Sequence, residues 1–321
     1  MQYIDVFNGD ADGICSLIQL RNANPQESEL VTGIKRDIQL LTQVNAQPGD
    51  YISILDISFE KNSADVRRLL NQGATIVYYD HHRQGMLFEH PRLQTFIDDQ
   101  SSEVCTALLV DKQLEGKFRT WALVAAFGDN LDSVAFKLGM ASGLKEELLA
   151  SLRSFGIYMN YNSYGENISD LFYPPAVLYQ HLKKYASPLD FLQEDDVIFN
   201  TLEEGYRQDM AKAEQSSFLY QSSQSAIILF HNKKWARRVS GVYINDLANR
   251  YPERAHAILT ENGDGTYKVS IRSSLHNRRI SADELASRFP TGGGRKNAAG
   301  INKLPGELLN QFVDDFKAYF S

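Results

Sequence analysis

The stretch Tyr78-Tyr79-Asp80-His81-His82-Arg83 places ionisable side chains directly after an apolar run. It follows Ala74-Thr75-Ile76-Val77, so one carboxylate and two imidazoles emerge where a β-branched segment ends. In an open α/β sheet the ligand crevice lies at the carboxyl ends of the strands. The stretch therefore predicts a buried strand over 75–79 with a functional site at its end.

The same arrangement occurs twice more, earlier in the chain. Tyr3-Ile4-Asp5-Val6-Phe7 leads into Asn8-Gly9-Asp10-Ala11-Asp12-Gly13, and Tyr51-Ile52-Ser53-Ile54-Leu55 leads into Asp56. If the three strands are parallel neighbours, their carboxyl ends meet at one edge of the sheet and these side chains converge. Carboxylates and neutral imidazoles suit Mn²⁺ or Mg²⁺. The repeated pattern therefore predicts a metal site at that edge.

Strand and helix patterns alternate over the first part of the chain, which is typical of a doubly wound parallel sheet in an α/β fold. Further strands are expected over 30–35 and 95–97, and helices over 14–21, 64–70, 103–114 and 119–127. The acidic loop then lies between a strand and a helix N-terminus, a place that binds ions and phosphates. The Tyr-rich segment 154–175 is expected to form surface helices or a lid.

A second, smaller α+β domain is expected in the last hundred residues. Its strands are predicted over 226–230, 255–260 and 267–272, and its helices over 242–250, 282–289 and 307–320. Asn262-Gly263-Asp264-Gly265 predicts a hairpin between two of these strands. The expected domains are therefore 1–190 and 223–321, joined by a long polar helix over 191–222.

Composition limits the classes of function. The chain has 321 residues, 43% of them hydrophobic, and a net charge of −7, which predicts two folded domains. No apolar run approaches the ~18 residues of a membrane span, and no signal pattern is present, so a cytoplasmic protein without membrane contact is expected. The acidic total argues against a stable complex with long nucleic acid, but not against a short anionic substrate. Cys15 and Cys105 are expected to be buried thiols, and a homodimer stays open.

Two segments of the predicted second domain are suited to ligand binding. Within Thr291-Gly292-Gly293-Gly294-Arg295-Lys296-Asn297-Ala298-Ala299-Gly300, three glycines leave backbone amides accessible and two cations add charge. An equally supported alternative is a flexible turn before a strand. Ser270-Ile271-Arg272-Ser273 supplies an arginine, which is a bidentate reader of phosphate.

Taken in order, these motifs resemble those of the DHH/DHHA1 phosphoesterase family, from residue 8 to residue 300. The matching positions are Asn8-Gly9-Asp10-Ala11-Asp12-Gly13, Asp56, Asp80-His81-His82, Gly128-Asp129, Ser270-Ile271-Arg272 and Gly292-Gly293-Gly294. The family includes RecJ-type single-strand exonucleases, nano-RNases and cyclic-dinucleotide phosphodiesterases. The resemblance implies two divalent ions, usually manganese, and an active site in the cleft between two domains.

The resemblance also implies a role for each matching residue. The stronger metal site would consist of Asp10, Asp56, His81 and Asp129, with Asp56 bridging to a second, weaker site that Asn8 and Asp12 would serve. The catalytic group would be His82, facing the scissile phosphate, with Asp80 and Arg272. Substrate would be bound by Arg272, Gly292, Gly293, Gly294, Arg295 and Asn297.

Three positions bear on how far the resemblance extends. Ile4 and Asn8 stand where many members have His and Asp, which leaves the second metal site short of ligands. Asp12 would compensate, or it would only cap the helix from Ile14 onward. Arg295 stands where the family often has His, and it favours a more anionic substrate group.

Several charged residues outside the motifs are not expected to be catalytic. Asp98, Asp99 and Asp132 are expected to be solvated or capping residues. Asp5 is expected at the sheet edge or behind the ligands. The basic cluster Lys233, Lys234, Arg237 and Arg238 is expected in a solvated turn rather than along a nucleic-acid track.

The sequence thus predicts a Mn²⁺- or Mg²⁺-dependent phosphodiesterase that hydrolyses linear dinucleotides, short oligonucleotides or related small phosphoesters. Two alternatives stay open. A RecJ-like single-strand exonuclease would need a basic channel and would lose affinity steeply with salt. A nucleotide-binding protein with an impaired second metal site would account for Asn8.

Overall fold

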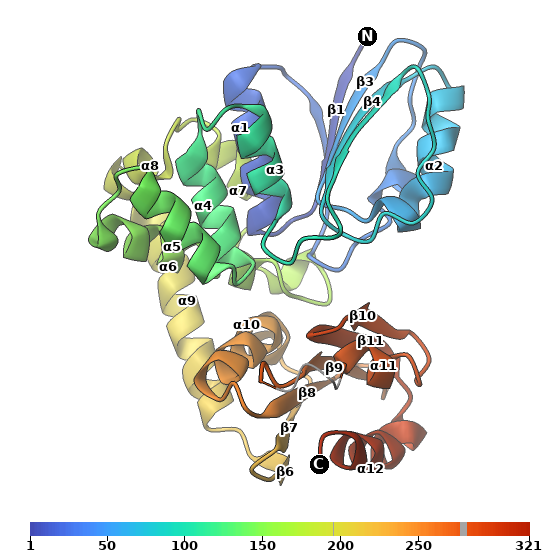
Figure 1. Cartoon of the computed structure of the whole chain (residues 1–321), viewed down its shortest axis with the longest axis vertical. Coiled ribbons are helices and arrows are strands. Elements are labelled where there is room, and N and C mark those ends of the chain that lie inside the picture. Colours follow the sequence, from blue (N-terminus) through green and yellow to red (C-terminus); the bar gives the residue numbers. More distant parts are fainter. Residues whose placement is uncertain (195, 277–280) are drawn as a thin grey trace. The chain divides into compact units, whose positions relative to one another are not determined.

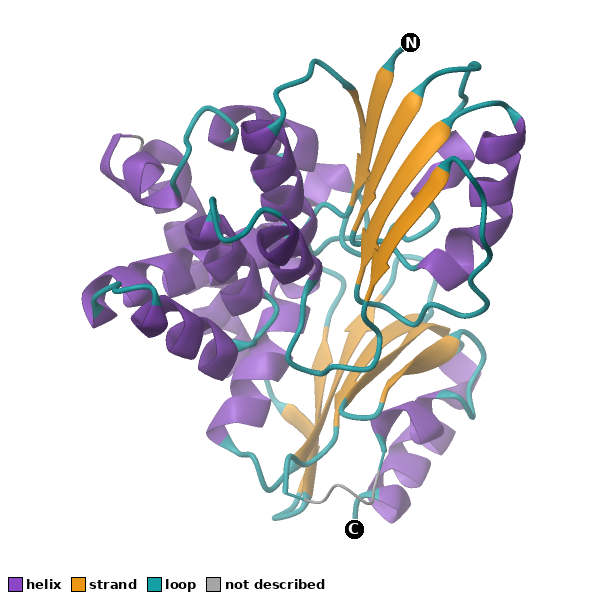
Figure 2. Cartoon of the chain, turned by 45° about the horizontal axis from the view of Figure 1, so that its top comes forward, coloured by secondary structure: helices purple, strands orange, loops and turns teal. Residues whose placement is uncertain are grey.

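The computed structural model describes residues 1–194, 196–276 and 281–321. Within them the chain divides into two compact units, Met1–Glu203 and Glu204–Ser321. This division falls inside 191–222, the segment expected to connect two domains. Figures 1 and 2 show the helices and strands of each unit. No described helix is both long and apolar enough to cross a membrane.

A parallel sheet forms the centre of the first unit. Its strand order is β2-β1-β3-β4-β5, and each neighbouring pair is parallel. The strands are β1 (Tyr3–Phe7), β2 (Glu29–Thr32), β3 (Tyr51–Leu55), β4 (Thr75–Asp80) and β5 (Leu93–Ile97). The order reverses between β1 and β3, which is where sheets of this kind bind ligands beyond their carboxyl ends.

Helices cover both faces of this sheet (Figure 1). Alternate strand residues supply two cores, because successive side chains of a strand point to opposite faces. Ile54 and Ile76 pack in the core that α2 completes, whereas Leu55 and Val77 pack in the core that α1, α3 and α4 complete. The helices are α1 (Ala11–Ala23), α2 (Phe59–Asn71), α3 (Thr106–Gln113), α4 (Arg119–Gly128), α5 (Asp132–Ala141), α6 (Glu146–Asn162) and α7 (Pro175–Leu182), with short 3₁₀ turns at Leu40–Gln43 and Ile168–Asp170. The predicted doubly wound α/β fold is confirmed.

Asp5 lies in the middle of this sheet, so the expectation of a sheet-edge position is wrong. Its carboxylate is fully buried and forms an ion pair with Arg21 of α1, whose Nε donates to Asp5 Oδ2 at 2.8 Å. The Ser28 hydroxyl donates to the same oxygen at 2.6 Å, and the Arg21 guanidinium also donates to Ser53 Oγ at 3.1 Å. The ion pair therefore ties α1 to β1 and β3.

Two expectations for the middle of the chain are wrong. The segment 191–222 is not helical throughout, because α9 (Asp196–Glu214), which α8 (Pro188–Glu194) precedes, is followed by strand β6 (Phe218–Gln221). Ser216 and Ser217 separate helix from strand, and serine favours turns over helix interiors. The Tyr-rich segment is not a surface element throughout, since Tyr161 and Tyr164 are buried.

The second unit is built on a mixed sheet of order β10-β11-β9-β8-β7-β6. Strands β7 and β8 are parallel and the other neighbours are antiparallel. The further strands are β7 (Ser225–Phe230), β8 (Ala255–Glu261), β9 (Tyr267–Arg272), β10 (Gly292–Arg295) and β11 (Ala298–Leu304), and the helices are α10 (Lys234–Arg250), α11 (Ala282–Ala286) and α12 (Leu309–Tyr319), with a 3₁₀ turn at Gly306–Leu308. The hairpin predicted between β8 and β9 is present, closed by a hydrogen bond from Asn262 N–H to the Thr266 carbonyl at 2.8 Å.

The glycine-rich segment is strand β10 at one edge of this sheet, so neither an open loop nor a flexible turn is correct. A Cβ on Gly292 would lie 1.8 Å from the Ala286 carbonyl oxygen, and one on Gly294 would lie 2.4 Å from Ala299 Cα. These two glycines are therefore required for close packing against α11 and β11. Three residues without side chains carry no alternating pattern, which is why the sequence did not indicate a strand.

We expect His256 to make the stability of the second unit depend on pH. The imidazole is buried in β8, and neither ring nitrogen has a hydrogen-bond partner among the described residues. Burial and the nearby Arg254 cation lower the pKa of His256 from 6.5 to about 4. Its stabilising contribution is therefore complete above pH 6.5, the unfolded value, and is lost as the pH falls from 6.5 towards 4.

This loss amounts to about 2 kcal/mol at pH 5 relative to pH 7. Urea unfolding of the full chain measures it. The His256→Phe variant, which cannot take up the proton, should lack this part of the acid destabilisation, while a variant at the exposed His231, His231→Gln, should retain it. Equal losses in the wild-type chain and in His256→Phe would contradict the assignment.

Candidate metal centre

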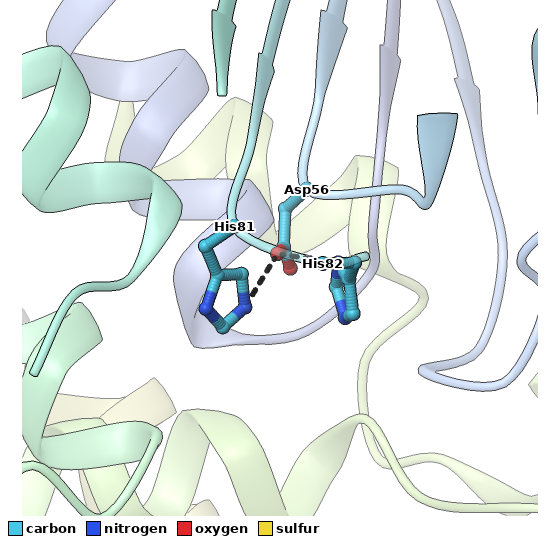
Figure 3. Close-up of side chains that lie close together, drawn as sticks. All are labelled: Asp56, His81 and His82. Atoms are coloured by element: carbon cyan, nitrogen blue, oxygen red, sulfur yellow. Dashed lines mark ion pairs between the residues drawn. The ribbon is translucent and has the colours of Figure 1, made fainter. Parts of the chain in front are cut away.

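Acidic and imidazole side chains meet at the carboxyl ends of β1, β3 and β4 in the first unit. His81 Nε2 lies 3.4 Å from Asp56 Oδ1, and 3.8 Å from both Asp12 Oδ2 and Asp129 Oδ2. Figure 3 shows His81 and His82 on either side of the Asp56 carboxylate. Two sets of donor atoms lie within 4.8 Å of one another, Asp56 with His81 and His82, and Asp12 with His81 and Asp129. The convergence that the strand ends predict is therefore present.

A hydrogen bond to the backbone orients the His81 ring. Its Nδ1 lies 3.0 Å from the Val104 carbonyl oxygen, which can only accept a hydrogen bond. Nδ1 is therefore the nitrogen that donates to the backbone, and Nε2 is the nitrogen directed at the carboxylates. A backbone carbonyl that fixes the tautomer in this way is the usual support of a metal-binding histidine.

Asp80 orients the two histidines rather than facing the carboxylate cluster. It accepts hydrogen bonds from the backbone N–H groups of His81 and His82, at 2.9 and 3.1 Å, and from Phe59 N–H at 3.0 Å. It also lies 2.7 Å from His82 Nδ1, so this nitrogen carries a proton and donates it. The His82 side chain is 34% exposed, and its Nε2 is the nitrogen available to a substrate.

Asp56 is held in an uncommon backbone conformation. Its φ is +59°, in the left-handed region that few residues other than glycine, asparagine and aspartate adopt. Its N–H donates to the Tyr79 carbonyl at 3.0 Å, and the Thr106 hydroxyl donates to Oδ1 at 3.1 Å. Such a conformation persists only where the surroundings fix it, as they do at many functional sites.

Burial and mutual repulsion disfavour the ionised form of the carboxylates in this cluster. Burial, followed by the charges of Asp10 and Asp129, raises the pKa of Asp56 well above its ordinary value. Burial, followed by Asp56 and Asp129, likewise raises the pKa of Asp12. A bound cation removes this penalty, since it neutralises the buried carboxylates.

Asp10 and Asp12 each cap a helix, but not in the expected way. Asp10 is the cap of α1, because its Oδ1 accepts the N–H groups of Asp12 and Gly13 at 3.0 Å. Asp12 instead accepts the first N–H groups of α3, from Thr106 and Ala107, at 2.7 Å each. The expectation that Asp12 caps the helix from Ile14 onward is therefore wrong, and its carboxylate joins α3 to the cluster.

Lys35, which the motifs did not include, reaches into the same cluster. Its Nζ forms an ion pair with Asp10 and lies 3.3 Å from Asp129 Oδ1 and 3.1 Å from Asn160 Oδ1. Burial alone lowers the pKa of Lys35, but Asp10 and Asp129 outweigh it and raise the pKa well above the usual value. Lys35 was expected as the last residue of a strand over 30–35, but β2 ends at Thr32, and no motif surrounds Lys35, so the sequence patterns did not indicate its place in the cluster.

Asn8 lies beside these groups and has an acceptor that nothing in the described structure satisfies. Its Nδ2 donates to the Lys35 carbonyl oxygen at 3.2 Å, whereas Oδ1 is buried and has no hydrogen-bond partner among the described residues. A buried amide oxygen without a donor is costly unless a water or a cation contacts it. This orphaned oxygen and the neighbouring carboxylates suit a hard divalent ion.

Charged residues outside the motifs have structural partners. Asp98 caps a turn by accepting Gln100 N–H at 3.1 Å, Asp99 accepts Gln84 N–H at 3.0 Å, and Asp132 pairs with Arg153 at 2.8 Å. The basic cluster at 233–238 is not a turn, since α10 begins at Lys234, and Arg238 of that helix pairs with Asp209 at 2.7 Å.

The expected substrate-binding residues of the second unit lie together at one end of its sheet. Arg272 ends β9, and its Nε donates to Asn245 Oδ1 of α10 at 2.9 Å. The register pairs Arg272 with Ala298, and Ala298 with Arg295. Paired residues share a face, so the two arginines lie on the same face two strands apart, about 10 Å between backbones. Asn297 adjoins them, and its carbonyl accepts Ser273 N–H at 3.3 Å.

Residues 219–321 match the family model of the DHHA1 domain. No curated protein matches the sequence. Among solved structures, exonuclease RecJ bound to manganese is similar with a TM-score of 0.62 and 15% identity, over 99% of this chain and 89% of that one.

Two further structures resemble the chain. RecJ of Thermus thermophilus in complex with Mn²⁺ has a TM-score of 0.58 and 15% identity, and the match covers 99% of this chain but only 52% of that one. The pGpG-specific phosphodiesterase PggH of Vibrio cholerae has a TM-score of 0.57 and 14% identity, over 99% of this chain and 100% of that one. Identities this low show a shared fold. The chain therefore shares the fold of these structures over nearly its whole length, and its residues 219–321 belong to the DHHA1 domain family.

Proposed function

We propose that the protein is a metal-dependent phosphodiesterase that hydrolyses short nucleotides, with linear dinucleotides as the first candidates. The observation that carries the proposal is the buried His81, whose Nε2 faces three carboxylates at 3.4 to 3.8 Å. The Val104 carbonyl occupies the other ring nitrogen, so Nε2 is free to bind a cation together with these carboxylates. One imidazole among several buried carboxylates is a donor set that suits a divalent cation.

Asp56, His81 and Asp129 would hold the ion, and the Asp12 carboxylate lies 3.8 Å from the same His81 nitrogen. This set of oxygen and imidazole donors suits Mn²⁺ or Mg²⁺. An ion bound there supplies Lewis acidity, which activates water and neutralises charge on a phosphate. The RecJ neighbours are solved with manganese, which makes Mn²⁺ the first ion to test.

His82 is the proposed catalytic residue of the chain. Asp80 accepts the Nδ1 proton of His82 at 2.7 Å and so fixes the orientation of the ring. When protonated, His82 can donate from Nε2 to a phosphate oxygen or to the leaving hydroxyl group. A positioned donor of this kind stabilises the charge that develops in the transition state.

The proposed substrate is short. The match to PggH covers the full length of that phosphodiesterase, whereas the chain spans about half of the Thermus RecJ chain. A net charge of −7 also disfavours sequence-independent binding to a long polyanion. Arg272 and Arg295 offer local positive charge, which suits one terminal phosphate group.

A single-strand exonuclease is the second candidate, favoured by the RecJ fold of the chain. A length series separates the two. Rates with Mn²⁺ should be measured on a linear dinucleotide, on RNA and DNA of increasing length, on a cyclic dinucleotide and on phosphoadenosine phosphate. Turnover that falls as length increases supports the proposal. Turnover that persists on long single-stranded DNA would replace it with the exonuclease, and binding without turnover would replace it with a nucleotide-binding protein.

Arg272→Ala is expected to weaken substrate binding more than turnover. The loss of a charge-assisted contact to phosphate costs about 1.5–3 kcal/mol, so KM should rise about 10- to 100-fold while kcat changes less. Steady-state kinetics on a linear dinucleotide checks this, with the exposed Arg288→Ala as the control that leaves KM unchanged. An unchanged KM in Arg272→Ala would remove this residue from the substrate site.

A further inference from the structure

Lys35 is fixed in place by its backbone before its side chain enters the metal centre. Its N–H donates to the Ser163 carbonyl at 3.0 Å, and its own carbonyl accepts from Asn8 Nδ2 at 3.2 Å. The side chain is 24% exposed and ends among carboxylates that the first unit buries. It is therefore a built component of this cluster rather than a surface lysine that has folded inward.

The Lys35 ammonium group has a complete set of acceptors. It has three hydrogens to donate, and three oxygens surround it, from Asp10, Asp129 and Asn160. The Asn160 amide is itself oriented, since its Nδ2 donates to the Gly128 carbonyl at 2.7 Å and so turns Oδ1 towards Lys35. A site with three matched acceptors is a specific cation site.

The two acids that contact Lys35, Asp10 and Asp129, are among the metal ligands that the family resemblance implies. Asp10 uses Oδ1 for the N–H groups at the start of α1 and Oδ2 for Lys35, so both of its oxygens are engaged. Asp129 directs Oδ1 to Lys35 and Oδ2 towards His81 Nε2, at 3.3 and 3.8 Å respectively. Asp129 therefore lies between the Lys35 ammonium group and the His81 imidazole, with one oxygen towards each.

We propose that the Lys35 ammonium group takes the place of one of two metal ions, so that the chain binds a single divalent ion beside Asp56, His81 and Asp129. The neutral Asn8 fits this arrangement, because a monovalent ammonium needs fewer negative charges around it than a divalent ion does. A second divalent ion next to Asp10 would meet the fixed positive charge of Lys35 at close range. The inference rests on the proposed metal-dependent function and specifies its site.

The number of bound ions tests this directly. Equilibrium dialysis of the full chain against Mn²⁺, followed by metal analysis, should give one ion per chain in the wild type and in Lys35→Arg, and two in Lys35→Met. Lys145→Met, at an exposed position, is the matched control and should bind one. Electron paramagnetic resonance adds a second readout, since one isolated Mn²⁺ gives a six-line spectrum and two neighbouring ions give a coupled spectrum.

Two ions in the wild type would overturn the inference, whatever becomes of the variants. One ion in both the wild type and Lys35→Met would overturn it as well, because the ammonium group would then not be what excludes the second ion. If Lys35→Met does not fold, the same measurements are made on Lys35→Gln, which should also bind two ions, and the wild-type spectrum should still show one isolated ion. A wild-type chain that binds two ions and hydrolyses phosphodiesters would contradict the inference but not the proposed function. A wild-type chain that binds one ion and hydrolyses none would contradict the proposed function but not the inference.

Discussion

His81→Ala should lose Mn²⁺ binding and phosphodiesterase activity together. His81 Nε2 is the donor common to both sets of ligand atoms, and Nδ1 is already committed to the Val104 carbonyl. Without the imidazole, the carboxylates still repel one another, and the nitrogen ligand between them is missing. We expect kcat/KM to fall by at least about 10²–10³-fold, as when one electrostatic stabiliser of a transition state is removed.

The comparison needs a histidine elsewhere in the same unit. His181 lies in α7 and is exposed, so His181→Ala should keep both metal and activity. Isothermal titration with Mn²⁺ and initial rates on one dinucleotide measure the two properties independently. Full activity in His81→Ala would show that the metal centre has been assigned wrongly.

Arg21→Met should destabilise the first unit more than other single changes to its polar groups. The substitution leaves the Asp5 carboxylate buried between β2 and β3 without its cation, and among the described residues only Ser28 continues to donate to it. Removing one partner of a buried ion pair costs about 3–5 kcal/mol. Urea unfolding should show this loss, and the double variant Asp5→Asn with Arg21→Met should recover part of it.

An exposed ion pair provides the control. Arg207 and Glu204 pair at 2.7 Å on the surface, so Arg207→Met should leave the unfolding midpoint close to that of the wild type. A similar midpoint for Arg21→Met would mean that water or another group compensates Asp5. The buried pair would then not be a determinant of stability.

Sequence patterns predicted the parallel sheet because its strands are short apolar runs followed by polar residues. They located Asp56, Asp80 and His81 for the same reason, since residues at the carboxyl ends of parallel strands must meet. The patterns also indicated the β8–β9 hairpin, because Asn-Gly and Asp-Gly pairs are favoured in the tight turns that join antiparallel strands. In each case the local sequence and the tertiary structure impose the same requirement.

Other features depend on contacts that sequence spacing does not encode. Asp12 caps α3, which begins 94 residues later at Thr106, and no pattern near Asp12 in the sequence indicates this partner. Lys35 lies in a loop without a motif, so its place among the acids depends on how β2 joins the sheet. The glycines of β10 were ambiguous because their role is to let α11 and β11 approach.

The most direct test of the account is the hydrolysis of a linear dinucleotide such as pGpG by the purified full chain, with Mn²⁺ and with a chelator in excess. We expect release of mononucleotide with Mn²⁺, no release with chelator, and recovery of activity when Mn²⁺ is added back. Turnover that continues in chelator would contradict the metal centre. No cleavage of this or any other short phosphodiester with Mn²⁺ bound would contradict the proposed function.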